Sequence, residues 1–212
     1  MENHIAEHQI LIDIFKQNNI IPTIILDIGA YDCSDSIKFS EYWPNAKIYA
    51  FEPNPEGIAM SKENINNHDN IELIEYAISD IDGYVDWYQS GGGSLGSSSI
   101  KKPVDHLILH PTVIFNEKTT IKSIKLDTWV KERNIDVIDL MWCDVQGAED
   151  LLINGAQETL KKTRCFYTEY FDFEVYKNQP SLENMKTRLT NFKLAGVKGN
   201  NALFTNIKIN TI

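Results

Sequence analysis

The hydrophobic pattern along the first 80 residues alternates between extended and helical periods. Residues 23–28 form a dense apolar run, rich in β-branched side chains, between Pro22 and Gly29, which predicts a strand buried on both faces. The neighbouring patterns predict a helical extension within residues 1–20, helices over 34–42 and 56–66, and strands over 47–52 and 71–79. Such alternation is typical of a parallel sheet with helices on both faces.

The second half continues this pattern until its last element. We expect strands over residues 121–126, 137–144 and 165–171, and helices over 127–133, capped by Asp127, 147–160 and 181–189. Residues 193–197 and 202–206 are strand-like and are separated by Gly199, Asn200 and Asn201, so they must pair antiparallel. A dinucleotide-binding dehydrogenase would continue with another crossover helix. The pattern therefore predicts an α/β fold whose mostly parallel sheet finishes in an antiparallel hairpin.

A glycine- and serine-rich segment interrupts the middle of the chain. Residues 91–99 read GGGSLGSSS and lie between strand-like segments, which favours a mobile loop over a domain boundary. We therefore expect a single domain over residues 1–212, with a helical extension over 1–20 and a mobile insertion over 90–118.

Composition excludes several classes of partner. The chain has 30 acidic and 20 basic residues, a net charge of −10, so it repels nucleic acid backbones and anionic membrane surfaces. Its three cysteines form no CxxC pair, and its N-terminus lacks the pattern of a signal peptide. We expect a cytoplasmic protein with neither nucleic acid nor membrane as partner. The sequence does not indicate an oligomeric state.

Two residues at predicted strand ends indicate a ligand that contains a nucleoside. Gly29 follows the first buried strand, and Glu52 comes 23 residues later at the end of the next strand. A carboxylate about 20 residues after the glycine turn is placed to accept hydrogen bonds from ribose hydroxyls. Both NAD and S-adenosylmethionine fit this spacing. A dinucleotide-binding turn typically has the pattern GxGxxG, whereas this turn has one glycine. In addition, Asp32 and Asp35 would repel a pyrophosphate. The residues favour a cationic methyl donor.

Six segments, taken in order, resemble the FkbM-type S-adenosylmethionine-dependent methyltransferases. They are ILDIGAYDCSDS, IYAFEPNPE, YAISDIDGYVDWY, GSSSI, IKLDTWV and IDLMWCDVQGAEDLLINGA, and together they span roughly residues 24–156. The resemblance implies a class I methyltransferase fold, which is a Rossmann-like, seven-stranded, mostly parallel sheet with a C-terminal antiparallel hairpin. It also implies O-methylation, with sugars, glycans or similar small hydroxyl compounds as acceptors.

The resemblance also implies roles for individual residues. Those assigned to the methyl donor form the turn after the first strand, the ribose-binding acid with its neighbour, and the edge of the adenine pocket: Asp27, Gly29, Ala30, Tyr31, Asp32, Ser36, Glu52, Pro53, Ala77, Ile78 and Ser79. Two positions depart from the family pattern. Cys33 replaces a frequent glycine, and Gln146 stands where DVEGAE has a glutamate.

Methyl transfer to an alcohol requires alignment of the acceptor oxygen and a group that accepts its proton. Asp144, at the end of a central strand, is the first candidate for that catalytic group, and Glu169, at the end of the next strand, is the second. A divalent ion held by Asp144 with Glu149 or Glu169 would acidify a bound hydroxyl, but we assign no metal ligands and regard this as the less favoured alternative. Two other functions stay open: a nicotinamide-dependent oxidoreductase, and a non-catalytic nucleoside-binding module of a larger protein.

Overall fold

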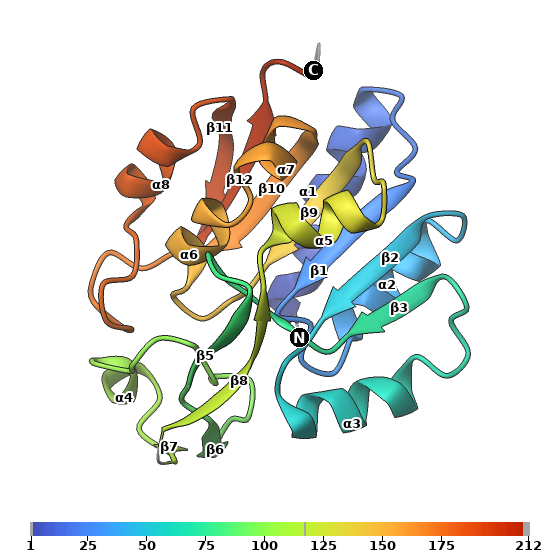
Figure 1. Cartoon of the computed structure of the whole chain (residues 1–212). Helices are drawn as coiled ribbons and strands as arrows, with labels where there is room; N and C mark the ends of the chain where they lie inside the picture. The colour runs from blue at the N-terminus through green and yellow to red at the C-terminus, as the bar shows by residue number, and fades with distance from the viewer. Residues whose placement is uncertain (1, 117, 210–212) are drawn as a thin grey trace.

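A seven-stranded sheet in the order β11-β12-β10-β9-β1-β2-β3 forms the centre of the computed structural model, which describes residues 2–116 and 118–209, with side chains from residue 8 onward (Figure 1). The strands are β1 (Ile24–Ile28), β2 (Lys47–Phe51), β3 (Ile71–Ile74), β9 (Ile138–Cys143), β10 (Thr163–Glu169), β11 (Phe192–Lys198) and β12 (Asn201–Asn206). The first five of these pair in parallel, and β12 pairs antiparallel with both β10 and β11. This is the predicted class I methyltransferase sheet with its terminal hairpin.

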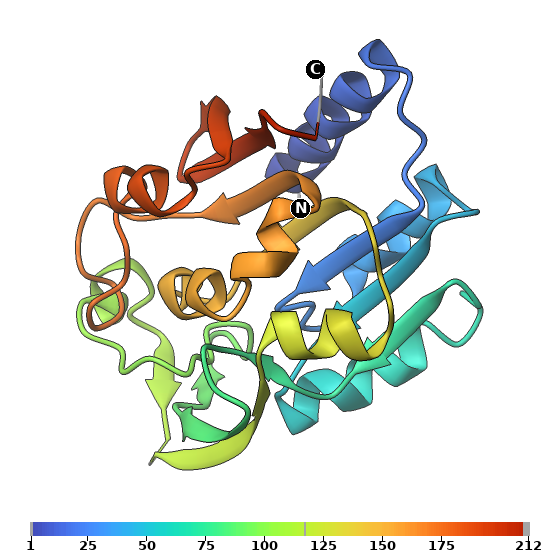
Figure 2. The ribbon, with the colours of Figure 1, turned by 45° about the horizontal axis from the view of Figure 1, so that its top comes forward.

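Alternate residues of β1 serve two hydrophobic cores, one on each face of the sheet. Ile25 packs with Phe15 and Phe39 from the helices of one face, whereas Leu26 packs with Trp129 and Leu152 from the helices of the other. The first face carries α1 (Glu2–Gln17) and α2 (Ser34–Tyr42), and α3 (Pro55–Asn64) follows β2. The second carries α5 (Leu126–Glu132), α6 (Glu149–Asn154), α7 (Gln157–Lys161) and α8 (Leu182–Arg188) (Figure 2). Because successive side chains of a strand point to opposite faces of the sheet, helices pack on both faces. The fold therefore has three layers, with the sheet in the middle.

The segment between β3 and α5 forms its own small sheets at the carboxyl edge of the main sheet (Figure 1). A three-stranded sheet contains β4 (Ala77–Ile78), β8 (Thr119–Ile124) and β5 (Gly83–Trp87), and a hairpin joins β6 (Ser90–Gly92) to β7 (Val113–Phe115), with α4 (His106–Leu109) between them. The predicted insertion, residues 90–118, contains this hairpin. Its mobility and the single-domain boundaries stay predictions, and residues 1, 117 and 210–212 within those boundaries lie outside the described residues.

Three predicted elements differ in detail. The expected strand over 71–79 breaks after Ile74, because Tyr76 N–H donates back to the Ile74 carbonyl and the next residues pair with β8 instead. The expected helix over 147–160 breaks at Gly155, where a Cβ would lie 2.0 Å from the Ser79 carbonyl oxygen. Asp127 does not cap its own helix, α5, whose N-cap is Lys125. Its carboxylate instead accepts hydrogen bonds from the backbone N–H groups of Glu158 and Thr159, at the start of α7.

No helix in the described parts of the chain combines the length and apolar character needed to cross a membrane.

Candidate active site

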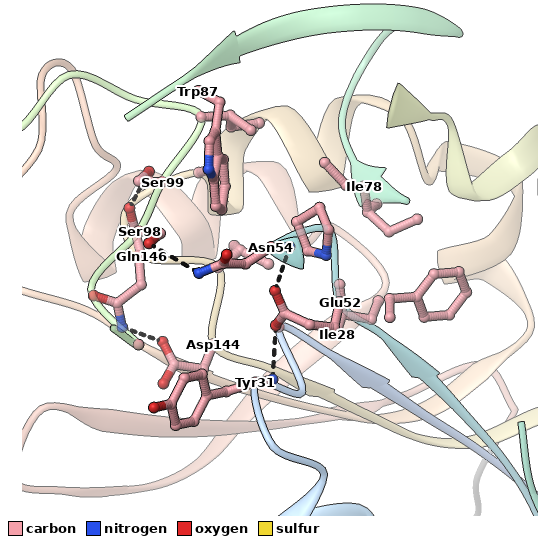
Figure 3. Close-up of a pocket in the computed structure, with 18 of the residues that line it drawn as sticks. Ile28, Tyr31, Glu52, Asn54, Ile78, Trp87, Ser98, Ser99, Asp144 and Gln146 are labelled. Carbon is pink, nitrogen blue, oxygen red and sulfur yellow. Dashed lines mark hydrogen bonds between the residues drawn. The ribbon is translucent and has the colours of Figure 1, made fainter. Parts of the chain in front are cut away.

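A pocket of about 540 Å³ opens at the carboxyl ends of β1, β2 and β9 (Figure 3). The chain runs from β1 outward to β2 and β3 and later returns to place β9 on the other side of β1. Open α/β sheets bind ligands where the strand order reverses in this way. The position of the pocket therefore suits a nucleoside-containing molecule.

The turn after β1 forms the floor of the pocket, and it requires glycine at its first position. Gly29 has φ +89°, and a Cβ on it would lie 1.9 Å from the backbone oxygen of Asp144. Its N–H donates to the Phe51 carbonyl, which holds the turn against the end of β2. Cys33, the departure from the family glycine, is fully buried with φ 62°. This left-handed conformation explains why glycine suits that position, and the thiol lies in the core beneath the turn.

Glu52 joins the turn after β1 to the turn after β2. Its Oε2 accepts a hydrogen bond from the Tyr31 N–H and its Oε1 accepts one from the Asn54 N–H, each at 2.7 Å (Figure 3). Burial raises the pKa of Glu52 to about 7, although both backbone hydrogen bonds act to lower it. Each carboxylate oxygen has a second lone pair, so Glu52 can still accept hydrogen bonds from a ligand in the pocket that it lines.

The sequence-predicted site residues divide into two groups. Those that line the pocket are Gly29, Tyr31, Glu52, Pro53, Ala77, Ile78 and Asp144. Those that lie outside its lining are Asp27, Ala30, Asp32, Ser36, Ser79 and Glu169.

The residues of the second group support the pocket from behind or lie beyond it. Asp27 is buried and accepts a hydrogen bond from Ser36 Oγ at 2.5 Å beneath the turn. Burial, followed by the nearby charge of Asp35, raises the pKa of Asp27 to about 8. Asp32 accepts the Ser34 N–H at the start of α2, and Glu169 ends β10. Ala30 and Ser79 are buried behind the lining.

Asp144 is held by a neighbour that the sequence marked only as a departure from the family pattern. Gln146 Nε2 donates to Asp144 Oδ1 at 2.6 Å (Figure 3). Gln146 Oε1 lies 2.8 Å from the hydroxyl of Tyr176. Gln146 has φ 52°, so its backbone turns sharply just after β9 and brings the amide back over the strand end. Tyr176, from the segment between β10 and α8, is 1% exposed.

The glycine- and serine-rich segment closes one side of the pocket. Leu95, Gly96, Ser98, Ser99 and Ile100 line it. Ser99 Oγ donates to the Gln146 carbonyl at 2.7 Å, and Ser98 Oγ accepts the Ser90 N–H at 2.9 Å. The segment is therefore tied both to its own hairpin and to the turn after β9.

Asn54 and Trp87 are among the lining residues that sequence reasoning missed. Asn54 follows Glu52, and its Nδ2 lies 3.4 Å from Ser98 Oγ. Trp87 ends β5, and its buried Nε1 has no hydrogen-bond partner among the described residues. No local pattern distinguishes an indole that lines a pocket from one that fills a core, because the difference lies in the packing of the insertion.

The charge of the site suits a cation. Besides Asp144, the carboxyl groups of Asp27, Glu52 and Glu149 gather around the turn. Burial is the main cause that raises the pKa of all three, and the Asp144 charge raises each further. A ligand with a sulfonium and an ammonium group would relieve this repulsion, whereas a pyrophosphate would add to it. The residues present therefore fit S-adenosylmethionine. Within the described residues, no group of three or more His, Cys, Asp or Glu side chains is arranged to hold a metal ion.

Comparisons with known proteins agree with this geometry. The Methyltransferase FkbM domain family matches residues 27–194. The 2-O-methyltransferase NoeI of Sinorhizobium fredii (strain NBRC 101917 / NGR234) is 39% identical over 196 residues, which cover 88% of this chain and 80% of that protein.

Solved structures share the fold at low identity. One is described as a caffeoyl-CoA O-methyltransferase from Staphylococcus aureus, with a TM-score of 0.52 at 11% identity over 93% of this chain and 81% of that one. Another is described as an rRNA-methylase from Clostridium thermocellum, with a TM-score of 0.52 at 9% identity over 92% and 93%. At these identities the likeness concerns the fold alone. The extent of the family match and the similarity to NoeI settle the class: the chain belongs to the FkbM methyltransferase domain family.

Proposed function

We propose that this S-adenosylmethionine-dependent methyltransferase methylates a hydroxyl group of a sugar, and that the sugar 2-hydroxyl is its target. The similarity to a protein named as a 2-O-methyltransferase supports the position. The observation that carries the proposal is that Asp144, Glu52 and the turn at Gly29 line one pocket. A proton acceptor and a nucleoside-binding carboxylate therefore face the same space.

The pocket provides different surroundings for the two ends of the donor. Glu52 would accept hydrogen bonds from the ribose hydroxyls, and Ala77 and Ile78 would contact the adenine ring. Asp144, on the opposite side of the turn, would face the methionine end and the reacting methyl group (Figure 3). The donor supplies a methyl group on a positively charged sulfur, which is already activated toward attack.

Asp144 is the residue that we propose as the general base. An alcohol attacks the methyl carbon more readily as its proton passes to a nearby acceptor. The carboxylate of Asp144 lines the pocket and is held in place by Gln146. Glu169 ends the neighbouring strand outside the pocket lining and stays the second candidate.

Calorimetry with S-adenosylhomocysteine and, separately, with NAD tests the ligand class. We expect binding of the sulfur ligand in the micromolar range and none of the dinucleotide. Binding of NAD without binding of S-adenosylhomocysteine would contradict the inference that the pocket binds a methyl donor.

The acceptor is tested by transfer of a labelled methyl group from S-adenosylmethionine to a panel of methyl glycosides, each paired with its 2-deoxy analogue. We expect label in a glycoside and none in its 2-deoxy partner. Asp144→Asn should lower turnover roughly 100-fold or more while it keeps affinity for S-adenosylhomocysteine. Asp136→Asn, an exposed change of the same kind, is the matched control. Equal labelling of the 2-deoxy analogue would contradict the position, and full turnover by Asp144→Asn would contradict the assigned base.

The location of the protein is also a proposal. The cysteines Cys33, Cys143 and Cys165 are buried free thiols. This state suits a reducing compartment and supports a cytoplasmic location.

A further inference from the structure

Three polar side chains form a line that leads away from the pocket. Asp144 Oδ1 lies 2.6 Å from Gln146 Nε2, and Gln146 Oε1 lies 2.8 Å from the hydroxyl oxygen of Tyr176. The same hydroxyl lies 2.7 Å from the backbone oxygen of Ser97, in the segment that closes the pocket. The line therefore connects the proposed base to the insertion.

A count of protons shows that this line is incomplete while Asp144 is charged. The Gln146 amide then donates to the carboxylate, and the amide oxygen needs a donor of its own. Tyr176 has a single hydroxyl proton, and both acceptors around it, the oxygens of Gln146 and Ser97, lie within 2.8 Å. One of these two oxygens must go without a full hydrogen bond.

Donors and acceptors along the line are matched when Asp144 carries a proton and the Gln146 amide group rotates by 180°. The Asp144 hydroxyl then donates to Gln146 Oε1, Nε2 donates to the Tyr176 oxygen, and Tyr176 donates to the Ser97 carbonyl. Every contact now has one donor and one acceptor. The heavy atoms need not move, because the nitrogen and oxygen of an amide are nearly equal in size and exchange places.

We propose that Gln146 is a positioning residue whose amide turns with the protonation state of Asp144, and that the Tyr176 hydroxyl makes the protonated state the better satisfied one. This inference rests on the proposed function, in which Asp144 receives the proton of the acceptor. The acceptor oxygen bonds to the methyl carbon, the carbon–sulfur bond breaks with its electron pair left on sulfur, and the proton passes to Asp144. The turned amide accommodates that proton until water removes it.

A side chain that hydrogen-bonds both the charged and the protonated form of Asp144 has to be an amide. A glutamate at position 146 would place a second carboxylate against Asp144, and the two would have to share a proton. An apolar side chain would offer a partner to neither form. Only a group with a donor at one end and an acceptor at the other can serve both states.

Titratable groups from every neighbouring element also act on Asp144. They include Asp27 of β1, Glu52 after β2, Cys143 of β9, Glu149 of α6 and Tyr176. Lys101 pairs with Asp150 beside Glu149. All of them except the Tyr176 hydroxyl are unchanged when Tyr176 becomes phenylalanine, so that substitution isolates the hydroxyl.

The test follows the titration of Asp144 by NMR of protein labelled with ¹³C at the aspartate carboxyl carbons, the signal being assigned by its loss in Asp144→Asn. In the unligated protein, Tyr176→Phe removes one shared bond from the charged state and two bonds from the protonated state. We expect the titration midpoint of Asp144 to fall by roughly half to one pH unit. Tyr84→Phe, at a residue that is 66% exposed, should leave the midpoint unchanged.

The sign of the shift decides the question. If the amide were a fixed clamp with Nε2 always toward Asp144, loss of the tyrosine hydroxyl would loosen the clamp and raise the midpoint. A rise, or no change, overturns the proposal.

These measurements need no acceptor, so their outcome is separate from that of the proposed function. Binding of S-adenosylhomocysteine shows that each variant is folded. Full methyl transfer by Asp144→Asn alongside a lowered midpoint in Tyr176→Phe would refute the catalytic assignment and leave the turning amide standing.

Discussion

The carboxylate of Glu52 accepts the backbone N–H of Tyr31 at 2.7 Å, and this bond fixes the distance between the two turns that flank the pocket. The other carboxylate oxygen is engaged by the Asn54 N–H. A ligand that reaches Glu52 therefore meets a carboxylate whose orientation is already set.

Glu52→Gln should weaken donor binding and destabilise the fold together. The new amide nitrogen would face one of two backbone N–H groups, so a donor would meet a donor in a buried place. We expect a loss of about 1–3 kcal/mol in the free energy of unfolding and a fall of tenfold or more in affinity for S-adenosylhomocysteine. Urea unfolding and calorimetry measure the two effects. Glu56→Gln, on an exposed residue of α3, is the control and should change neither.

Gly29→Ala should lower the free energy of unfolding by more than the positive φ of Gly29 alone explains. At Gly29 both the conformation and the Asp144 carbonyl oppose a Cβ, whereas at Gly83, with φ +138°, nothing lies within 4 Å of it. We expect Gly83→Ala to lower the free energy of unfolding by about 1–3 kcal/mol. Gly29→Ala should lower it further and also abolish donor binding. Equal losses in the two variants would show that the turn can move away from the strand end.

Affinity for the methyl donor should rise with pH between about 6 and 8. In the unligated protein, the raised pKa values of Asp27, about 8, and of Glu52 and Glu149, about 7, leave these groups partly protonated at neutral pH. A cation favours their charged forms, so its binding releases protons. Calorimetry in buffers of different ionisation enthalpy counts those protons. S-adenosylhomocysteine has no sulfonium charge, so a pH dependence as steep as that of S-adenosylmethionine would contradict this account.

Stability of the unligated protein has the opposite dependence on pH. The pKa of Asp27 is higher in the folded chain than its ordinary value of 3.8, so the folded state binds more protons over the interval between them. Its contribution to stability is therefore complete below about pH 4 and is lost as the pH rises through about 8. Asp27→Asn should flatten the fall in melting temperature between pH 5.5 and 8.5. Asp136→Asn, on the surface, should leave the slope as it is.

Trp87 lines the pocket and has a buried indole N–H without a hydrogen-bond partner among the described residues. Trp87→Phe should lower affinity for S-adenosylhomocysteine roughly tenfold if that N–H donates to the ligand. An unchanged affinity in calorimetry would show that the indole contributes only its ring.

The sequence was sufficient for the parts of the site that rest on local patterns. The strand before Gly29 and the spacing to Glu52 predicted two turns that now flank one pocket. Asp27 and Ser36 were predicted as donor-binding residues, but they lie beneath the turn, because their strand and helix positions face the core side of the sheet. Proximity along the chain could not separate the residues that line the pocket from those that support it.

The remaining features depend on contacts between distant segments. The strand-like segment over 71–79 gave no sign of its break, since its second part leaves the main sheet only because β8 is available to pair with it. Tyr176 lies 30 residues beyond Gln146, and no motif joins the two. Similarly, the carboxylate that satisfies the start of α7 is that of Asp127, 31 residues before Glu158.

The insertion contributes Leu95, Gly96, Ser98, Ser99 and Ile100 to the pocket but no strand to the seven-stranded sheet. The two halves of the pocket are thus encoded by separate stretches of chain, one constrained by the layered core and the other by a hairpin and a few serine contacts. A change within residues 90–118 therefore alters one wall of the pocket and leaves the turns after β1 and β2 in place. Grafting residues 90–118 between related enzymes is the corresponding engineering route, and the contact of Ser99 with the Gln146 carbonyl is the junction that such a chimera has to preserve.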